Sequence, residues 1–279
     1  MVDSSQIPSD IRRLMSEPHF PLGHVLLQNA DVFRALGLEM PLDQRLGQGS
    51  FGTVYQTHIG GGSALKLTRD VSEAQAACLL RGRQSKRIVH VHDVWAVPGT
   101  FDGDLRGWYL VHRELLSPLG AKDAIAANVI FQLYNDDIID LSLPRSMRQR
   151  AMVNRWRSHI HDFVMNDMGG GGVSVSDEGD MVFTNGGQIT KRALQLLLQI
   201  GSAVAEMHSA GIDWEDIHPD NLMRNAGGRL VIGDIGYGVM HEDFSDEVPF
   251  ITFEEAVAYR ARATTAASPS ESLQSPHPS

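Results

Sequence analysis

Short runs of apolar, β-branched and aromatic residues fill the first part of the chain and predict strands there. Four such runs lie at 53–58, 64–67, 88–95 and 108–113. The glycines at 60–62 supply a turn between the first two runs. One helix is expected from Ser72 to Leu80, with Ser72 as its N-cap. The pattern therefore predicts a small β-sheet with one helix over residues 41–115.

Segments in which apolar residues have helical spacing lie before and after this predicted sheet. An amphipathic stretch at 24–36 predicts a helix within a preface of residues 1–40, and Gly37 is a suitable stop. The strongest helical pattern of the chain runs to Met207, with Thr190 as its expected N-cap. The sequence therefore places a helix on each side of the predicted sheet region.

The segment between the predicted sheet and the helix that runs to Met207 is interpreted as an insert at about 120–188. Helices are expected near 121–134 and 145–166, followed by a polar hairpin that ends at Gly186-Gly187. At the other end of the chain, residues 264–279 are rich in Ser, Pro and Ala. That composition cannot bury enough apolar surface to fold, so we predict a disordered tail.

Composition narrows the class of protein. Hydrophobic residues make up 42% of the chain and charged residues 21%, as in soluble globular proteins. The net charge of -10 argues against nucleic acid as the main ligand, because binding to the phosphate backbone depends on Lys and Arg. A single cysteine, Cys78, excludes an internal disulfide and fits a reducing compartment. The chain shows no secretory signal and no apolar run near the ~18 residues of a membrane helix, so we expect a cytoplasmic protein.

A glycine-rich segment, Gly47-x-Gly49-x-x-Gly52, is the first candidate site. Alone it also occurs in dinucleotide-binding folds, where a strand precedes it and a helix follows. Here a β-forming segment follows, which favours a strand–loop–strand flap whose backbone amides approach phosphates. The flap would bind a nucleotide through Gly47, Gly49, Ser50, Phe51, Gly52 and Val54.

Lys66 lies on the strand expected after the flap, in the triplet Ala64-Leu65-Lys66. This triplet resembles the Val-Ala-Ile-Lys segment of protein kinases, in which the lysine contacts the α- and β-phosphates. Such a lysine needs an orienting carboxylate, and Glu73 on the next helix is the nearest candidate. The short gap between the two leaves a second interpretation open, a solvated glutamate favoured by the helix dipole.

Two acidic motifs follow the long predicted helix: Asp216-Ile-His-Pro-Asp-Asn221 and Gly233-Asp234-Ile-Gly236. Between them lies a predicted hairpin with its turn at 225–228. Together with the flap and Lys66, these motifs resemble the protein-kinase-like superfamily over roughly residues 42–240. The resemblance implies that Asp216 is the catalytic aspartate, and that Asn221 and Asp234 hold Mg²⁺.

Several positions depart from the usual kinase pattern. Trp214-Glu215 replaces the His-Arg pair that precedes the catalytic aspartate, so a phosphorylated activation loop would find no arginine partner. His218 stands where Ser/Thr kinases have lysine, as in aminoglycoside and choline phosphotransferases. About 45 residues follow Asp234, fewer than the C-terminal helices of typical kinases require. In this truncated plan the chain resembles the early Ser/Thr protein kinases of podovirus-type bacteriophages.

The resemblance implies an α+β, two-lobed protein-kinase-like fold. Its N-lobe would span 41–115 and its C-lobe 116–263, with Glu114 at the hinge contributing to nucleotide binding. ATP and Mg²⁺ are the implied cofactors, and the implied activity is phosphoryl transfer to a protein hydroxyl. A protein is therefore the expected partner, a host protein if the chain is viral, with no role for a membrane.

Two alternatives remain open from the sequence. A small-molecule phosphotransferase is favoured by His218 and Pro219, and a non-catalytic nucleotide-binding module by Glu215 and the short second lobe. Nucleotidyl transfer on the same fold also stays possible.

Two further groups of residues are more simply explained by structure than by function. His90, His92 and His112 are more simply strand histidines than a metal site, and the arginines at 145–157 more simply form a solvated helix face than a docking site for an acidic partner.

Overall fold

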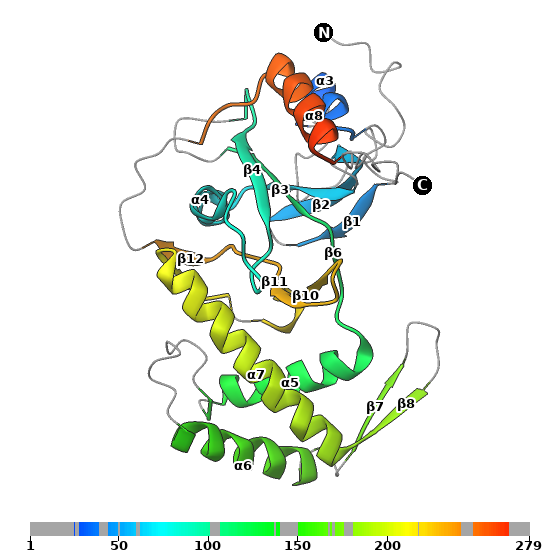
Figure 1. Cartoon of the computed structure of the whole chain (residues 1–279), viewed down its shortest axis with the longest axis vertical. Helices are drawn as coiled ribbons and strands as arrows, with labels where there is room; N and C mark the ends of the chain where they lie inside the picture. The colour runs from blue at the N-terminus through cyan, green and yellow to red at the C-terminus, as the bar shows by residue number, and fades with distance from the viewer. Residues whose placement is uncertain are drawn as a thin grey trace, which may run out of the picture.

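The computed structural model describes residues 25, 28–38, 44–49, 51–59, 62–100, 107–136, 138–139, 150–166, 168, 171–175, 181–216, 218–240 and 248–267. A five-stranded antiparallel sheet and three helices packed on it form one lobe. A group of helices, with a small sheet between it and the first lobe, forms the other (Figure 1). The predicted α+β class is confirmed. Ser50 of the expected flap lies outside the described residues.

The elements follow one another as the apolar spacing predicts for most of the chain. The helices are α3 (Ala30–Ala35), α4 (Val71–Leu80), α5 (Ala121–Asn135), α6 (Arg150–Asn166), α7 (Gly186–Ser209) and α8 (Phe253–Ala267), with a 3-10 turn η4 (Pro219–Asn221). The strands are β1 (Arg45–Gln48), β2 (Gly52–Thr57), β3 (Ser63–Thr68), β4 (Val91–Ala96), β5 (Tyr109–Glu114), β6 (Leu116–Ser117), β7 (Gly171–Val175), β8 (Met181–Asn185), β9 (Ile212–Trp214), β10 (Leu222–Asn225), β11 (Leu230–Ile232) and β12 (Gly238–Met240).

The large sheet has the strand order β1-β2-β3-β5-β4, and every neighbouring pair is antiparallel. Lys66 on β3 is paired with Val54 on β2 and with Val111 on β5. Because paired residues project to the same face and alternate residues to opposite faces, Arg113 shares the face of Lys66, whereas His112 lies on the other.

A second sheet of order β11-β10-β6 lies between the two lobes (Figure 1). The segment before β4 is hydrogen-bonded to it: Val89 N donates to Ile232 O at 2.9 Å, and Ile232 N donates to Arg87 O at 2.8 Å. The predicted hairpin between Asn221 and Asp234 is present as β10 and β11. Backbone hydrogen bonds thus tie the first lobe directly to this hairpin.

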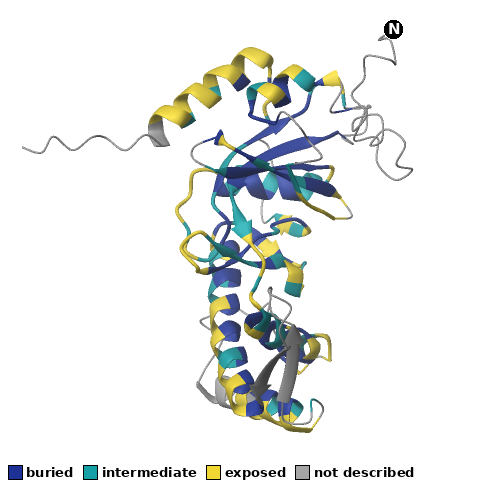
Figure 2. Cartoon of the chain, turned by 90° about the vertical axis from the view of Figure 1, so that its right-hand side faces the viewer, coloured by how far each residue is buried: buried dark blue, intermediate teal, exposed yellow. Residues whose placement is uncertain are grey.

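Two hydrophobic cores hold the chain together. The larger core joins α4 and one side of the large sheet to α5, α6 and α7. The smaller core lies on the other side of the sheet, under α3 and α8. Figure 2 shows the sheet buried and the outer side of α8 exposed. The domain prediction placed residues 116–263 in the C-lobe. Helix α8 packs with α3 on the N-lobe instead. Ala256 of α8 and Ile251, which lies just before α8, are both buried in the smaller core.

Three helix boundaries differ from those predicted. The N-cap of α4 is Asp70, whose carboxylate accepts from Ser72 N at 2.9 Å, rather than Ser72 itself. Helix α7 begins at Gly186, directly after β8, so the Thr190 hydroxyl lies inside the first turns and donates to Gly186 O at 2.8 Å. Helix α8 continues to Ala267, so the first residues of the predicted tail are helical, and residues 268–279 lie outside the described part.

His90, just before β4, forms a packed cluster with His92 and His112 on the sheet. The rings of His90 and His92, and of His92 and His112, lie 4.6 Å apart. His112 lies between the Ser63 hydroxyl at 2.6 Å and the Tyr259 hydroxyl of α8 at 2.7 Å. Within the described ranges no group of three His, Cys, Asp or Glu side chains is arranged to hold a metal. Of the predicted basic stretch, Arg157 is exposed on α6, and Arg145 and Arg148 lie outside the described residues.

Candidate functional site

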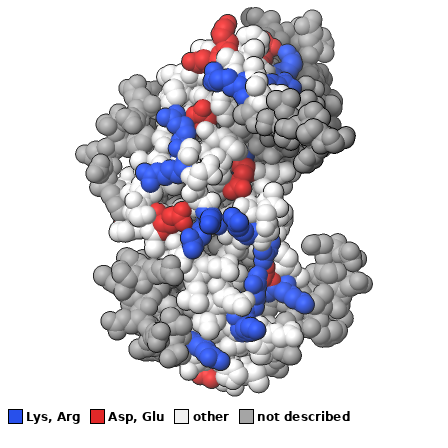
Figure 3. Space-filling model, in the orientation of Figure 1, with Lys and Arg blue, Asp and Glu red and all other residues white. Residues whose placement is uncertain are grey.

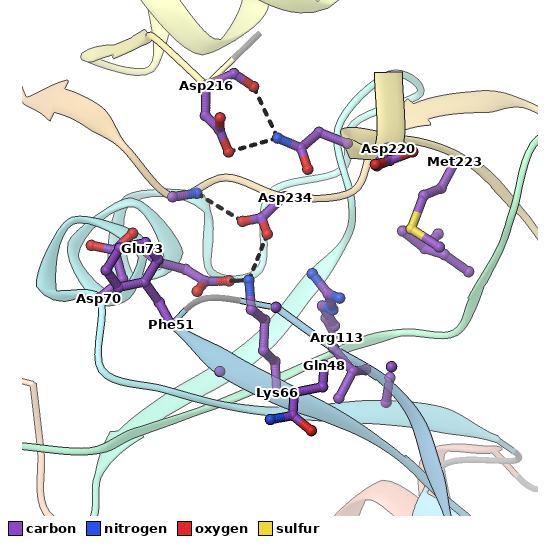
Figure 4. A pocket seen from close by; sticks show the side chains of 18 of the residues that line it. Gln48, Phe51, Lys66, Asp70, Glu73, Arg113, Asp216, Asp220, Met223 and Asp234 are labelled. Atoms are coloured by element: carbon purple, nitrogen blue, oxygen red, sulfur yellow. Dashed lines mark hydrogen bonds and ion pairs between the residues drawn. The ribbon is translucent and has the colours of Figure 1, made fainter. Parts of the chain in front are cut away.

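A cleft of about 600 Å³ lies between the first lobe and the β10–β11 hairpin (Figure 4). Its volume is in the range of small-molecule sites. Every predicted site residue that the structure describes lines it: Gly47, Gly49, Phe51, Gly52, Val54, Lys66, Glu73, Glu114, Asp216, Asn221 and Asp234. Apolar residues also line it, Leu46, Ala64, Leu116 and Met223 among them, and they offer a surface suited to a planar base.

The glycine-rich flap forms the edge of the cleft between β1 and β2. Gly49 N donates to Gly52 O at 2.9 Å, which closes the turn. A methyl group on Gly52 would come within 2.3 Å of Leu67 O on β3, so this position accepts only glycine. A methyl group added at Gly47 or Gly49 would meet no atom within 4 Å, so the backbone there faces open space. A ligand phosphate can therefore approach the flap closely.

Lys66 lies at the centre of the cleft, with its ammonium group 2.7 Å from Glu73 and 2.7 Å from Asp234 (Figure 4). Burial lowers the pKa of Lys66, but the two carboxylates outweigh this effect and hold the pKa above its ordinary value. Burial also raises the pKa of Asp234, yet Lys66 and Arg113 together bring it below the usual range. The lysine is thus charged and held between two carboxylates from different elements.

Glu73 is 1% exposed, which excludes the solvated interpretation of this residue. It reaches Lys66 because α4 begins three residues after β3 ends, so the first helical turn lies directly beside the strand. Burial raises the pKa of Glu73, and the nearby lysine opposes that rise. A buried carboxylate of this kind requires a cation partner, and Lys66 supplies it.

Asp216, Asn221 and Asp234 meet on the other side of the cleft. Asn221 donates its side-chain amide to the Asp216 carboxylate at 2.7 Å and to the Asp216 backbone oxygen at 2.9 Å. Gly233 N donates to Asn221 O at 2.7 Å, so Gly233, the residue before Asp234, lies next to Asn221. Gly236 N donates to the Asp234 carboxylate at 3.1 Å. Local hydrogen bonds therefore set the relative positions of all three side chains.

The oxygens present fit a magnesium ion that also contacts phosphates. The side-chain oxygen of Asn221 has no hydrogen-bond partner among the described residues, and Asp234 supplies a carboxylate of lowered pKa beside it. Mg²⁺ prefers oxygen ligands and is usually held by one or two protein groups, with phosphates and water completing the shell. A carboxamide and a carboxylate are suited to that arrangement.

Arg113 is a residue of the cleft that the sequence reasoning missed. It is 7% exposed, its guanidinium donates to Gly233 O, and its Nε has no hydrogen-bond partner among the described residues. The signal was available: alternation along β5 places Arg113 on the face of Lys66, and an arginine is unusual in an apolar strand. Glu114, beside it, lines the cleft, and its carboxylate accepts from His90 N at 2.9 Å.

Asp70 and Tyr237 were missed as well. Tyr237 N donates to the Asp70 carboxylate at 3.2 Å and to the Ser72 hydroxyl at 2.8 Å. The Tyr237 ring contacts Phe51 at the tip of the flap edge-to-face, with ring centroids 5.1 Å apart. Tyr237 has a left-handed backbone with φ of 53°. The segment after Asp234 is thus attached both to the start of α4 and to the flap.

Comparisons with known proteins give a fold similarity alone. No protein-family model and no curated protein matches the chain. Among solved structures, the chain is similar to one from the CAK complex of Chaetomium thermophilum bound to ATP-gamma-S, at 16% sequence identity and a TM-score of 0.32. The match covers 72% of this chain and 48% of that one. Similarity at this level says nothing about activity. No helix in the described ranges is both long and apolar enough to cross a membrane.

Proposed function

We propose that this protein is an ATP- and Mg²⁺-dependent phosphotransferase, and most specifically a Ser/Thr protein kinase of the protein-kinase-like superfamily. The observation that supports this proposal is the convergence of Lys66, Asp216, Asn221 and Asp234 in one cleft beneath a glycine-rich flap. Phosphoryl transfer needs a cation on the phosphates, metal ligands and a carboxylate that orients the attacking hydroxyl. Each of these chemical needs has a side chain of the right type in the cleft.

The side chains divide the work of transfer among them. Lys66, held by Glu73, would neutralise charge on the phosphates, while the flap backbone at Gly47 and Gly49, which faces open space, would cover them. Asn221 and Asp234 would hold Mg²⁺, which supplies positive charge to the phosphates when bound. Asp216 would orient the acceptor hydroxyl and accept its proton. Catalysis would then consist mainly of positioning and charge neutralisation.

An acceptor on another protein suits the surroundings of Asp216. This aspartate is half-buried, and its neighbours Glu215 and His218 are exposed. A side-chain hydroxyl carried by a second protein could therefore reach it from solvent. A small hydroxyl compound remains the second candidate acceptor, and the resemblance to bacteriophage kinases remains a prediction from the sequence. A cytoplasmic location is likewise a prediction.

Labelled ATP tests the proposal. We expect label to pass from γ-labelled ATP to Ser or Thr of proteins in a lysate, with Mg²⁺ required, and none from α-labelled ATP. Asp216→Asn should bind nucleotide yet lose most of the transfer, whereas Glu215→Gln, one residue away and exposed, should transfer normally. Label transferred only to a panel of hydroxyl compounds would favour the second candidate. Transfer from α-labelled ATP, or full activity of Asp216→Asn, would contradict the proposal.

A further inference from the structure

A second cavity lies outside the catalytic cleft and is lined mainly by cations. It has a volume of about 300 Å³, and its charged lining consists of Lys86, Arg87, Arg192, Arg224 and Arg229. These residues come from three separate parts of the chain: the segment before β4, helix α7, and the β10–β11 hairpin. Figure 3 shows Lys and Arg side chains gathered around the middle of the molecule, where the hairpin meets α7. We call this cavity the basic pocket.

The basic pocket carries a surplus of positive charge. Its ion pairs within the described part of the chain are with Asp123, which binds Arg192 and Arg224, and with Glu206, 3.6 Å from Arg87. Two carboxylates thus face five cations, a surplus of three positive charges. The whole chain has a net charge of -10, so this concentration of cations runs against its overall composition. Placing like charges together costs free energy, which a bound anion would recover.

Two of the arginines are positioned in advance. Asp123 is 7% exposed, and its carboxylate accepts from Arg192 Nε and from Arg224 Nη2. Burial raises the pKa of Asp123, but the two guanidinium groups outweigh this effect and bring the pKa below its usual value. Each guanidinium has five N–H donors and uses some of them here, so each keeps donors for a ligand. A buried carboxylate therefore holds the two arginines in place at the pocket wall.

The remaining cations are open to solvent. Lys86 and Arg229 are exposed, and neither side chain forms an ion pair with any described residue. The loop that carries Lys86 and Arg87 is tied by backbone hydrogen bonds to β11, which begins beside Arg229. The pocket therefore combines a rigid wall with two exposed cations whose long side chains can close on a ligand.

We infer that the basic pocket binds a phosphate monoester, presented either by a phosphorylated protein side chain or by a free phosphorylated small molecule. Several guanidinium groups in a rigid arrangement match the oxygens of a phosphate dianion, whereas a single carboxylate would leave most of the surplus charge unpaired. Strand β10 separates the basic pocket from the catalytic cleft. Met223 on β10 lines the cleft and the next residue, Arg224, lines the pocket, as side chains on opposite faces of a strand do.

Calorimetric titration of the full chain tests this inference. The probes are a phosphoserine peptide, its unphosphorylated counterpart, and glycerol 3-phosphate as a small phosphate monoester, in buffer of low salt without nucleotide or Mg²⁺. We expect binding of a phosphorylated probe, weakened about tenfold or more in Lys86→Gln/Arg229→Gln. The matched control is Arg157→Gln/Arg260→Gln, which removes the same charge from exposed positions on α6 and α8. It should bind as the wild type does.

The outcomes separate the two sources of phosphate. Preference for the phosphopeptide assigns the pocket to a protein partner, and preference for glycerol 3-phosphate to a small molecule. The inference is overturned if no phosphorylated probe binds at millimolar concentration, or if Lys86→Gln/Arg229→Gln binds as tightly as the wild type, since the probe would then lie in the catalytic cleft. An equal loss in the control pair would also overturn it, because the effect would be one of net charge. The titration needs no turnover and stands apart from the proposed activity.

Discussion

The backbone amide of Tyr237 donates to the carboxylate of Asp70, 3.2 Å away, although the two residues are 167 positions apart in the chain. The same carboxylate caps α4 through Ser72 N. One aspartate therefore joins the helix that carries Glu73 to the segment that carries Asp234. Since both of these carboxylates contact Lys66, the position of Asp70 bears directly on the geometry of the cleft.

Replacing Asp70 should loosen both connections. Asp70→Ala removes the cap of α4 and one of the two acceptors for Tyr237 N, and we expect a loss of about 1 kcal/mol of stability together with a clear loss of kcat. Asp70→Asn keeps one acceptor oxygen, enough for the cap on Ser72 N but not also for Tyr237 N, which binds the other carboxylate oxygen, so it should keep most of the stability and lose part of the kcat. Thermal unfolding and steady-state rates measure the two effects. If Asp70→Ala had an unchanged kcat, this connection would be structural and would not affect catalysis.

The buried ion pair of Lys66 and Glu73 leads to a prediction about how the stability of the protein depends on pH. In Lys66→Met, Glu73 keeps its burial and loses the cation that opposes the rise in its pKa. A carboxyl whose pKa is raised in the folded state contributes its full stability below the pKa of the unfolded chain and loses it as pH rises through the folded pKa.

The unfolding free energy of Lys66→Met should therefore fall between about pH 4.5 and neutrality, more steeply than that of the wild type. Denaturant titrations over this range measure the slope. Lys66→Met/Glu73→Gln is the control, because it removes the titrating group and should restore the shallow slope. An identical slope in the single and double variants would show that Glu73 does not respond to Lys66.

The flap glycines should respond differently to alanine. The added methyl group of Gly52→Ala meets Leu67 O at 2.3 Å, so β2 must move and we expect a cost of about 1–3 kcal/mol in stability. Gly47→Ala meets nothing within 4 Å and should fold as stably as the wild type. Thermal unfolding compares the two. Gly47→Ala should instead raise the KM for nucleotide, because its methyl group occupies space left for phosphate. Equal unfolding temperatures for both variants would contradict the close packing of β2 on β3.

Arg113 should affect nucleotide binding through the position of Asp234. Its guanidinium donates to Gly233 O, and its charge helps to lower the pKa of Asp234. Arg113→Met should therefore raise the KM for Mg·ATP by about tenfold, on the scale of one charged hydrogen bond. Arg113→Lys keeps the charge and should recover part of the loss. Titration of the variants with Mg²⁺ at constant ATP distinguishes a metal effect from a general loss of folding. If both variants had the wild-type KM, Arg113 would have no part in the site.

How far the sequence predicts this site depends on the range of the contacts. The motif residues and the strands that carry Lys66 follow from local pattern, because alternation and glycine spacing are local properties. The N-cap of α4 could not be chosen between Asp70 and Ser72 by pattern, since both are good caps; the contact with Tyr237 occupies Asp70 and comes from a distant segment. Arg113 is readable from alternation in retrospect, but its partner Gly233 is 120 positions away. The lobe on which α8 packs likewise depends on tertiary contacts, because its apolar residues would suit either lobe.

The docking of α8 on the first lobe has a consequence for the order in which the chain can fold. The outer core of the five-stranded sheet contains residues near the beginning of the described chain, such as Phe33, and residues near its end, such as Ile251 and Ala256. Synthesis proceeds from the N-terminus, so the sheet is made early but lacks part of its cover until α8 emerges. During that interval α3 can cover part of this sheet face, and the part that α8 covers stays exposed. The part of this core that α8 covers, around Ile251 and Ala256, is therefore completed only late in synthesis.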